Sequence, residues 1–410
     1  MTEFRSEDLI FDWNEAEDPP PYSLKLNDET LRDGLQSPSI TDPSIEDKIK
    51  ILHLMEELGV YSCDIGLPGA GPQAYNDTLA LAAEIARSGM KIYPYVAART
   101  HINDIIPLVE IVQKTGLKIQ IALFIFSSPI RQFAEDWDVD RMVKVSEDAI
   151  EFAHKNNIPV MYVTEDTTRA RPQTLERLYG IAIDHGVERL CISDTVGHAT
   201  PSGAREVTKF VRGLVERSGA DIGVDWHGHR DRALAIANAI TAFYSGADRI
   251  HGCGLGIGER VGNAPLDLLM VNFKLLGVFD QDLTKLPDYC RAVSEACNVP
   301  IPDNYPVMGA DAFRTATGVH ADAIIKAYRR GDHWLANRVY SGVPADEFGL
   351  AQIIEIGPMS GKSNVRHWLE EHNIPVTDKL VNKIFKEAKR VSTVLSDVEI
   401  MKLVGKSQSA

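Results

Sequence analysis

Two histidines lie two positions apart in the stretch DWHGHRD, and this spacing suits metal binding. On an extended strand end, residues i and i+2 point to the same side, so His227 and His229 can converge on one ion. A carboxylate from a nearby strand end would complete a two-histidine, one-carboxylate set with open positions for substrate oxygens and water. An isolated pair of this kind is more often two histidines satisfied by backbone or solvent, so the rest of the chain decides.

A second reactive stretch, LNDETLRDGLQSP (26–38), crowds Asp28, Glu29, Arg32 and Asp33 before a turn at Gly34. An exposed loop can carry such a run at no cost, whereas an active site can require it. If this stretch and the histidines end neighbouring strands, Asp33 is the candidate carboxylate.

Short apolar, β-branched runs recur along the first two-thirds of the chain, and helical patterns lie between them. The runs are 22–28, 60–66, 91–97, 118–124, 159–165, 189–194, 221–227 and 249–254. After the first run, Asp42 is expected to cap a helix that ends at Gly59. Eight alternating units predict an α/β fold, a closed (β/α)8 TIM barrel, with an open doubly wound sheet as the structural alternative.

Several of these runs end in ionisable or ligand-type residues. They are Asp28 with Arg32 and Asp33, then Asp64, Glu165 with Asp166, Asp194 with Thr195, and His227 with His229. In TIM barrels the chemistry lies at the carboxyl ends of the strands. Strand one neighbours strand seven across only strand eight, so these groups are expected to share one mouth.

Composition bounds the function. The chain has 410 residues, 44% hydrophobic and 25% charged, with a net charge of −15 that makes a nucleic-acid surface unexpected but leaves anionic small ligands open. Its five cysteines form no C-x-x-C pair, and no signal peptide precedes them, which favours a reduced cytoplasmic location. No apolar run approaches membrane-spanning length, so no membrane association is expected.

The glycine-rich stretch GCGLGIGERVGN (252–263) follows the eighth run, where glycine lets backbone approach a ligand closely. A dinucleotide fingerprint is rejected because it belongs after an early strand. GPMSGKS (357–363) imitates a P-loop but has one residue too few between its glycines.

DETLRDGLQ, HGHRD, SDTVGHATP and GIGERVGN together resemble the DRE-TIM metallolyase superfamily. Within it they are most similar to the Claisen-condensing synthases, which make isopropylmalate, citramalate or homocitrate. TEDTTRARP, FSSPIRQ and GVHADAIIKA add to the resemblance, which covers about residues 22–400 in the right order.

The resemblance implies a divalent cation, with Mg²⁺, Mn²⁺ and Zn²⁺ all compatible, and acetyl-CoA as co-substrate with a 2-oxo acid. It assigns Asp33, His227, His229 and, in a ligand or near-ligand position, Asn263 to the metal. Catalytic roles fall to Arg32, Glu165, His320 and Tyr340, and substrate binding to Gln36, Asp64, Thr195, Arg131 and Arg230. An acyl-CoA loop would contain Gly256, Gly258, Glu259 and Arg260. His320 and Tyr340 would reach a partner subunit's barrel, which implies a homodimer with shared sites.

Departures from the family pattern concern the substrate. Leu35 stands where isopropylmalate synthases usually carry an acid, as in hydroxymethylglutaryl-CoA lyase, and Asp64 is shorter than the usual glutamate. Ala122 replaces a frequent histidine. Arg131 and Arg230 replace a histidine and an asparagine, and could bind a second carboxylate or CoA phosphates, or equally be surface residues.

The predicted organisation is an N-terminal extension (1–21), a TIM-barrel catalytic domain (22–276), a proline-punctuated linker (277–306) and helical C-terminal subdomains (307–410) without a leucine-regulatory domain. In the last region, Thr377 or Asp378 is expected to cap a helix.

Three functions are weighed. The leading one is condensation of acetyl-CoA with a 2-oxo acid, with 2-oxoisovalerate favoured because Leu35, Phe124 and Phe126 offer apolar surface. Homocitrate, citramalate or citrate synthase-type condensation is the first alternative, and lyase-type cleavage of hydroxymethylglutaryl-CoA the second. A barrel kept as a ligand sensor is the non-catalytic alternative, and retention of all three metal ligands argues against it.

Overall fold

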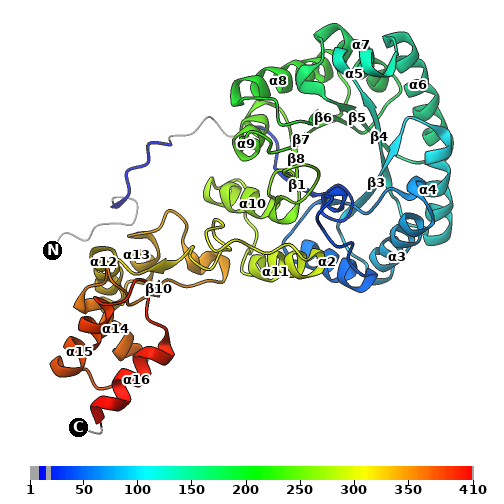
Figure 1. Ribbon diagram of the computed structural model, residues 1–410. Helices are drawn as coiled ribbons and strands as arrows, with labels where there is room; N and C mark the ends of the chain where they lie inside the picture. Colours follow the sequence, from blue (N-terminus) through cyan, green and yellow to red (C-terminus); the bar gives the residue numbers. More distant parts are fainter. Residues whose placement is uncertain (1–8, 15–19, 409–410) are drawn as a thin grey trace. The chain divides into compact units, whose positions relative to one another are not determined.

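The computed structural model describes residues 9–14 and 20–408, and the chain divides into two compact units, Met1–Asp280 and Gln281–Ala410 (Figure 1). Each unit is described by itself. Most of the predicted N-terminal extension, residues 1–8 and 15–19, lies outside the described residues.

The first unit is a closed barrel of eight parallel strands, as the eight apolar runs predicted. The strands are β1 (Lys25–Asp28), β2 (Ser62–Asp64), β3 (Tyr93–Arg99), β4 (Gln120–Phe126), β5 (Val160–Glu165), β6 (Arg189–Asp194), β7 (Gly223–Gly228) and β8 (Arg249–Gly252). Pairing of Lys25 in β1 with Arg249 in β8 closes the ring. The open-sheet alternative is therefore excluded.

Helices surround the strands on the outside of the barrel (Figure 1). They are α2 (Ile45–Glu57), α3 (Pro72–Ser88), α4 (Ile102–Thr115), α5 (Pro129–Glu135), α6 (Val139–Lys155), α7 (Pro172–Asp184), α8 (Pro201–Ser218), α9 (Ala235–Ser245) and α10 (Leu266–Leu275). The cap of α2 differs from the prediction: Ser44 accepts the Asp47 amide, while Asp42 pairs with Lys48. Gly59 does follow the helix, with φ +74°.

Short 3₁₀ turns follow four of the strands: η1 (Gly34–Gln36), η2 (Pro68–Ala70), η3 (Thr167–Arg169) and η4 (Gly254–Gly256). They lie at the carboxyl ends of β1, β2, β5 and β8. The chain therefore turns tightly where the ionisable residues gather.

The barrel interior combines an apolar cluster with buried charge. Tyr95, Ala122, Met161 and Cys191 pack together, whereas Arg249 is fully buried among polar partners. All five cysteines of the chain are buried. Along the described residues, no helix combines the length and the apolar character needed to cross a bilayer.

The second unit is mostly helical. Its elements are α11 (Leu286–Cys297), β9 (Arg314–Thr315), α12 (Gly318–Arg329), α13 (His333–Arg338), η5 (Ala345–Phe348), β10 (Ile353–Ile354), α14 (Lys362–Glu371), α15 (Asp378–Ala388) and α16 (Asp397–Gln408). Thr377, one of two predicted caps, accepts the Leu380 amide. Helix α11 occupies part of the segment predicted as a linker, because Leu286, Tyr289 and Val293 bury one face of it. The short parallel β9–β10 pair was not predicted.

Candidate active site

Three predicted metal ligands meet at the carboxyl ends of β1 and β7. One ligand atom from each of Asp33, His227 and His229 lies within 4.8 Å of the others. His229 Nε2 is 3.9 Å from Asp33 Oδ2, too far for a hydrogen bond. Two ligands about 2.1 Å from a shared ion lie roughly 3 Å apart or slightly more, so an ion fits between them with little adjustment.

Two buried polar atoms beside this group have no hydrogen-bond partner among the described residues, namely His229 Nδ1 and Asn263 Oδ1. The Asn263 amide nitrogen donates to Asp33 Oδ2 at 2.7 Å. Buried polar atoms are rarely left unsatisfied without a functional cause. An ion between Asp33 Oδ2 and His229 Nε2 would leave His229 Nδ1 unsatisfied, so the support comes from Asn263 Oδ1 together with the nitrogen and oxygen donors of the three residues, which fit a divalent cation.

Arg32 lies beside the ligands and is held by two carboxylates. Its Nη1 is 2.6 Å from Asp33 Oδ1, and its Nε is 2.6 Å from Asp64 Oδ2. Burial raises the pKa of Asp64 to about 7, against the opposing charge of Arg32. Asp64 is fully buried under Arg32 and lines neither cavity described below, so its contact is with the arginine.

The sequence analysis noted Glu29 in the charged run without giving it a role, and it did not name His251 or Tyr95. Glu29 Oε2 is 2.6 Å from His227 Nδ1, its Oε1 is 2.9 Å from His251 Nδ1, and Tyr95 donates to Oε1 at 2.8 Å. The sequence did contain an indication of Glu29 and His251. Polar residues occur two positions apart at β1, β7 and β8, and this is the spacing of side chains on one face of a strand.

Burial and charge act in opposite directions on this group. Burial disfavours the charged carboxylate of Glu29, yet His227 and His251 hold its pKa well below the usual range. Burial also disfavours a charged His227, but Glu29 raises its pKa to about 9. Burial, followed by the charge of His227, lowers the pKa of His229 to about 4. The two histidines therefore lie in unlike electrostatic surroundings.

A cavity of about 290 Å³ opens over these residues, and we call it the mouth cavity. Its lining is Glu29, Arg32, Asp33, Gln36, Leu67, Tyr95, Ala97, Ala122, Phe124, Met161, Val163, Glu165, Cys191, Ser193, Thr195, His227, His229, His251 and Glu259. Predicted residues from six strand ends are thus brought together at one place.

The remaining predicted substrate residues are engaged in different ways. Thr195 lines the mouth cavity, and its hydroxyl oxygen accepts the Asp166 amide. Arg131 pairs with Glu165 and Glu135, each at 3.3 Å. Arg230 donates to the Val261 carbonyl and does not line the cavity. Neither Arg131 nor Arg230 presents an uncommitted charge to the mouth cavity.

The loop predicted to bind acyl-CoA is held over the site by specific contacts. Gly256 and Gly258 have φ values of +62° and +144°, which favour glycine. Glu259 lines the mouth cavity. Arg260 pairs with Asp231 at 2.8 Å and donates to the Thr195 carbonyl at 2.7 Å, tying the loop to the end of β6.

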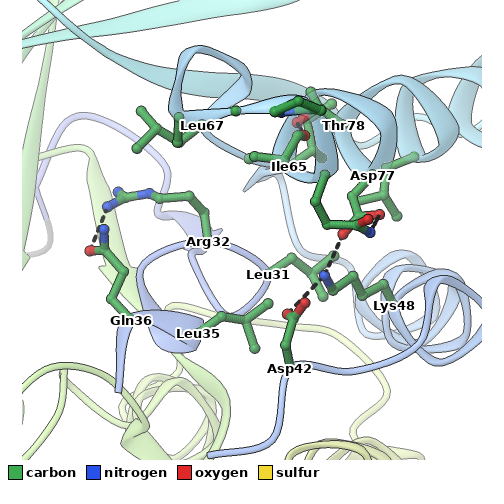
Figure 2. A pocket seen from close by; sticks show the side chains of 17 residues that line it. Leu31, Arg32, Leu35, Gln36, Asp42, Lys48, Ile65, Leu67, Asp77 and Thr78 are labelled. Carbon is green, nitrogen blue, oxygen red and sulfur yellow. Dashed lines mark hydrogen bonds and ion pairs between the residues drawn. The ribbon is translucent and has the colours of Figure 1, made fainter. Parts of the chain in front are cut away.

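A second cavity of about 470 Å³ lies between the segments that follow β1 and β2, and Figure 2 shows it; we call it the side cavity. Leu31, Leu35, Ile65 and Leu81 make it largely apolar. Its far end holds Lys48 between Asp42 and Asp77, at 2.9 and 2.7 Å. The side and mouth cavities share Arg32, Gln36 and Leu67, so they adjoin.

His320 and Tyr340 belong to the second unit. Their rings stack with centroids 3.8 Å apart and planes inclined by 24°. Tyr340 is about half exposed (48%). The two rings therefore form one stacked pair of an intermediate and an exposed side chain. Their proposed action in a partner subunit stays a prediction.

The fold and the site together define the class: a TIM-barrel protein with an aspartate and two histidines at the carboxyl end of the barrel. The family follows from the sequence comparison. Residues 23–293 match the family model described as HMGL-like, and the chain belongs to this family. The predicted membership in the DRE-TIM group is thereby confirmed.

Curated relatives extend over most of the chain. It is 29% identical over 378 residues to a 2-isopropylmalate synthase of Lactococcus lactis subsp. cremoris, covering 90% of this chain and 70% of the relative. It is 27% identical to the (R)-citramalate synthase of Methanocaldococcus jannaschii, with coverages of 93% and 74%. A homocitrate synthase of Methanopyrus kandleri is 29% identical, with coverages of 90% and 88%. These three names differ in the product of the reaction.

Solved structures confirm the fold. An HMG-CoA lyase from Bacillus subtilis superposes with a TM-score of 0.55 at 19% sequence identity, covering 69% of this chain and 97% of the lyase. At this identity the likeness concerns the barrel fold alone.

Proposed function

We propose that this protein is a metal-dependent synthase that condenses acetyl-CoA with a 2-oxo acid and releases CoA. The observation that carries the proposal is the group of Asp33, His227 and His229 beside the unpaired Asn263 Oδ1, under a cavity that Arg32 also lines. The names of the relatives, all of them condensing synthases, support it.

A divalent ion bound by Asp33, His227 and His229 would polarise the keto group of the 2-oxo acid as a Lewis acid. The guanidinium of Arg32 lies beside this position and would stabilise negative charge on the keto oxygen as the new carbon–carbon bond forms. Thr195 uses its hydroxyl oxygen as an acceptor, which leaves its proton free to donate to the substrate carboxylate.

A base must remove a proton from the methyl group of acetyl-CoA, and water then hydrolyses the thioester to release CoA. We assign the base role to Glu165, which lines the mouth cavity. Burial raises its pKa above that of an ordinary glutamate, while Arg131 opposes the shift. A raised pKa suits a general base that works near neutral pH.

The side cavity provides room for the arm of acetyl-CoA. It shares Arg32 and Gln36 with the mouth cavity. Its apolar walls (Figure 2) suit the pantetheine chain. The loop with Gly256 and Gly258 would cover the thioester from the other side.

For the 2-oxo acid we favour 2-oxoisovalerate, which would give 2-isopropylmalate. Leu67, Ala97 and Phe124 present apolar surface to the mouth cavity. Arg131 is paired with two carboxylates, and Arg230 lies outside the cavity lining, so a second substrate carboxylate would have no uncommitted partner there. Of the other apolar residues considered, Leu35 lines the side cavity and Phe126 packs on Trp137.

The test is release of CoA, measured with a thiol reagent, from acetyl-CoA and each of 2-oxoisovalerate, pyruvate, oxaloacetate and 2-oxoglutarate. We expect 2-oxoisovalerate to give the highest kcat/KM, in the wild type and in Arg131→Ala. Pyruvate should be a secondary substrate, because apolar pockets separate close homologues by only about 1–3 kcal/mol.

Two outcomes would contradict the proposal. The substrate assignment would be overturned if a dicarboxylate gave the highest kcat/KM in the wild type but not in Arg131→Ala. If the protein cleaves hydroxymethylglutaryl-CoA and shows no condensation activity, it is a lyase and the proposal of a synthase is wrong.

A further inference from the structure

A chain of buried hydrogen-bonded side chains leads from His227 into the barrel. His227 Nδ1 faces Glu29 Oε2 at 2.6 Å, Glu29 Oε1 faces His251 Nδ1 at 2.9 Å, and His251 Nε2 faces Asp225 Oδ2 at 2.8 Å. Glu29, His251 and Asp225 are 3%, 1% and 0% exposed. Water cannot replace any of these partners without entering the core.

The far end of this chain is fixed. Asp225 also accepts from Arg249 at 2.6 Å and from Arg189, so its carboxylate is held from several sides. His251 bridges this anchored carboxylate and Glu29. Tyr95 donates a further hydrogen bond to Glu29 at 2.8 Å. Glu29 therefore has little freedom to rotate.

The contact determines which nitrogen of His227 is available. An ionised carboxylate only accepts, so the short contact requires a proton on His227 Nδ1. The lone pair of a neutral imidazole then lies on Nε2. In this arrangement His227 can bind an ion through Nε2 while it donates to Glu29 through Nδ1.

Glu29, His227 and His251 also lie close enough together to hold an ion themselves. Their contacts argue against that use, because the Glu29 oxygens already pair with ring nitrogens at 2.6 and 2.9 Å. Among the described residues, the unpaired buried atoms include His229 Nδ1 and Asn263 Oδ1 beside Asp33, whereas none belongs to Glu29 or His251. Glu29 and His251 are thus placed to support the ion site beside them.

We propose that Glu29 is a positioning residue that fixes the tautomer and the ring orientation of His227 for metal binding, and that His251 orients Glu29. The inference rests on the metal site of the proposed function. Carboxylates that accept from a metal-binding histidine typically account for 10–100-fold in metal affinity.

The test compares metal dissociation constants of the wild type and Glu29→Gln, by calorimetric titration of each apoprotein with Mn²⁺. We expect about 10–100-fold weaker binding in the variant. The matched control is Glu84→Gln, which changes a glutamate that also contacts a histidine, His53 at 2.8 Å, on helices of the barrel exterior. The control should bind Mn²⁺ as the wild type does.

A second measurement separates positioning from general stability. In ¹⁵N-histidine-labelled, Zn²⁺-loaded protein, His227 should carry its proton on Nδ1 in the wild type and lose this strict preference in Glu29→Gln. If Glu29→Gln does not fold, His251→Gln takes its place, with an expected several-fold loss of Mn²⁺ affinity.

Equal Mn²⁺ affinity and an unchanged His227 tautomer in the folded variant would overturn the inference while leaving the metal site intact. Failure of the wild type to bind any divalent ion would instead overturn the metal site of the proposed function, and this inference with it.

Discussion

The charged residues at the end of β1 and just after it make different contacts. Asp28 accepts the Thr30 amide at 2.7 Å and shapes the turn, Glu29 contacts two histidines, and Arg32 and Asp33 face the mouth cavity. The sequence predicted Asp33 and the two histidines together because their strand ends had to converge. It could not predict Glu29 as a partner of His227, because that pairing joins residues 198 positions apart and depends on strand register.

Metal binding at the residue scale is tested by His227→Ala. Removal of one of three proposed ligands should reduce the metal content of the purified protein to background, measured by mass spectrometry of the elements. His198→Ala, at an exposed histidine near the same end of the barrel, is the control and should retain the metal. Undiminished metal in His227→Ala would contradict the assignment.

The pairing of Glu165 with Arg131 predicts a pH effect. A general base must be deprotonated, so activity should fall as pH drops through the pKa of Glu165, which burial raises and Arg131 lowers. Arg131→Ala removes the lowering influence. The acidic limb of kcat/KM should therefore move to higher pH.

Arg141→Ala is the control for that profile, because Arg141 stacks on Trp137, with 3.9 Å from its guanidinium carbon to the ring centroid. Its acidic limb should coincide with that of the wild type. A limb that stays in place or moves to lower pH in Arg131→Ala would argue against Glu165 as the base.

At the scale of elements, the periodic apolar runs predicted eight alternating strand–helix units and favoured the closed barrel over an open doubly wound sheet. Parallel strands bury both faces in either arrangement, so burial alone does not distinguish the two, and it is the pairing of β1 with β8 that closes the barrel. The predicted cap of α2 was wrong: Ser44, directly before Ile45, is the N-cap, and Asp42 pairs instead with Lys48 in the same helix. The pairing of β9 with β10 was missed because it joins Arg314 to Ile353, and local sequence does not indicate such a distant partner.

The loop after β8 gives a test of backbone geometry. A Cβ at Gly258, where φ is +144°, would lie 2.3 Å from Asn263 Nδ2. Gly258→Ala should displace Asn263 from Asp33, weaken metal binding and destabilise the protein by about 1–3 kcal/mol. Urea unfolding and Mn²⁺ titration measure the two effects.

Gly180→Ala is the matched control, because an added Cβ on this α7 residue meets nothing within 4 Å. Alanine in a helix is favoured over glycine by about 0.5–1 kcal/mol, so this variant should be slightly more stable. If Gly258→Ala binds metal as tightly as the control, the assignment of Asn263 to the metal site is wrong.

At the scale of the whole molecule, the chain consists of two units with separate cores. The second unit has its own apolar cluster, which includes Val365, Leu369 and Ile384. The sequence placed the end of the barrel near residue 276, and the two units divide after Asp280. The helical character of the last region was predicted from periodicity, whereas which side chains would form its core was not.

The proposed sharing of sites between subunits is a prediction at this scale. Asp33→Ala lacks a proposed metal ligand, and His320→Ala lacks one ring of the stacked pair in the second unit. If His320 acts in the barrel of a partner subunit, each variant alone should be inactive, and a mixture should recover part of the activity after subunit exchange. CoA release and sedimentation velocity measure recovery and assembly.

No recovery despite demonstrated exchange would contradict shared sites. A monomer in sedimentation that retains full activity would contradict them more directly. Lys326→Ala, at an exposed-face residue of α12 that pairs with Asp322, is the control and should remain active by itself.

Because all five cysteines are buried, their reaction with a thiol reagent reports when the protein unfolds. Burial raises the pKa of Cys63, Cys191 and Cys253, so little thiolate exists to react while the chain is folded. Colour from a thiol reagent should therefore report released CoA in the native enzyme, with a low background from the protein. On heating or in urea, the same reagent would count protein thiols as they reach solvent, and the order in which Cys63 of the barrel and Cys290 of α11 become labelled would show which unit opens first.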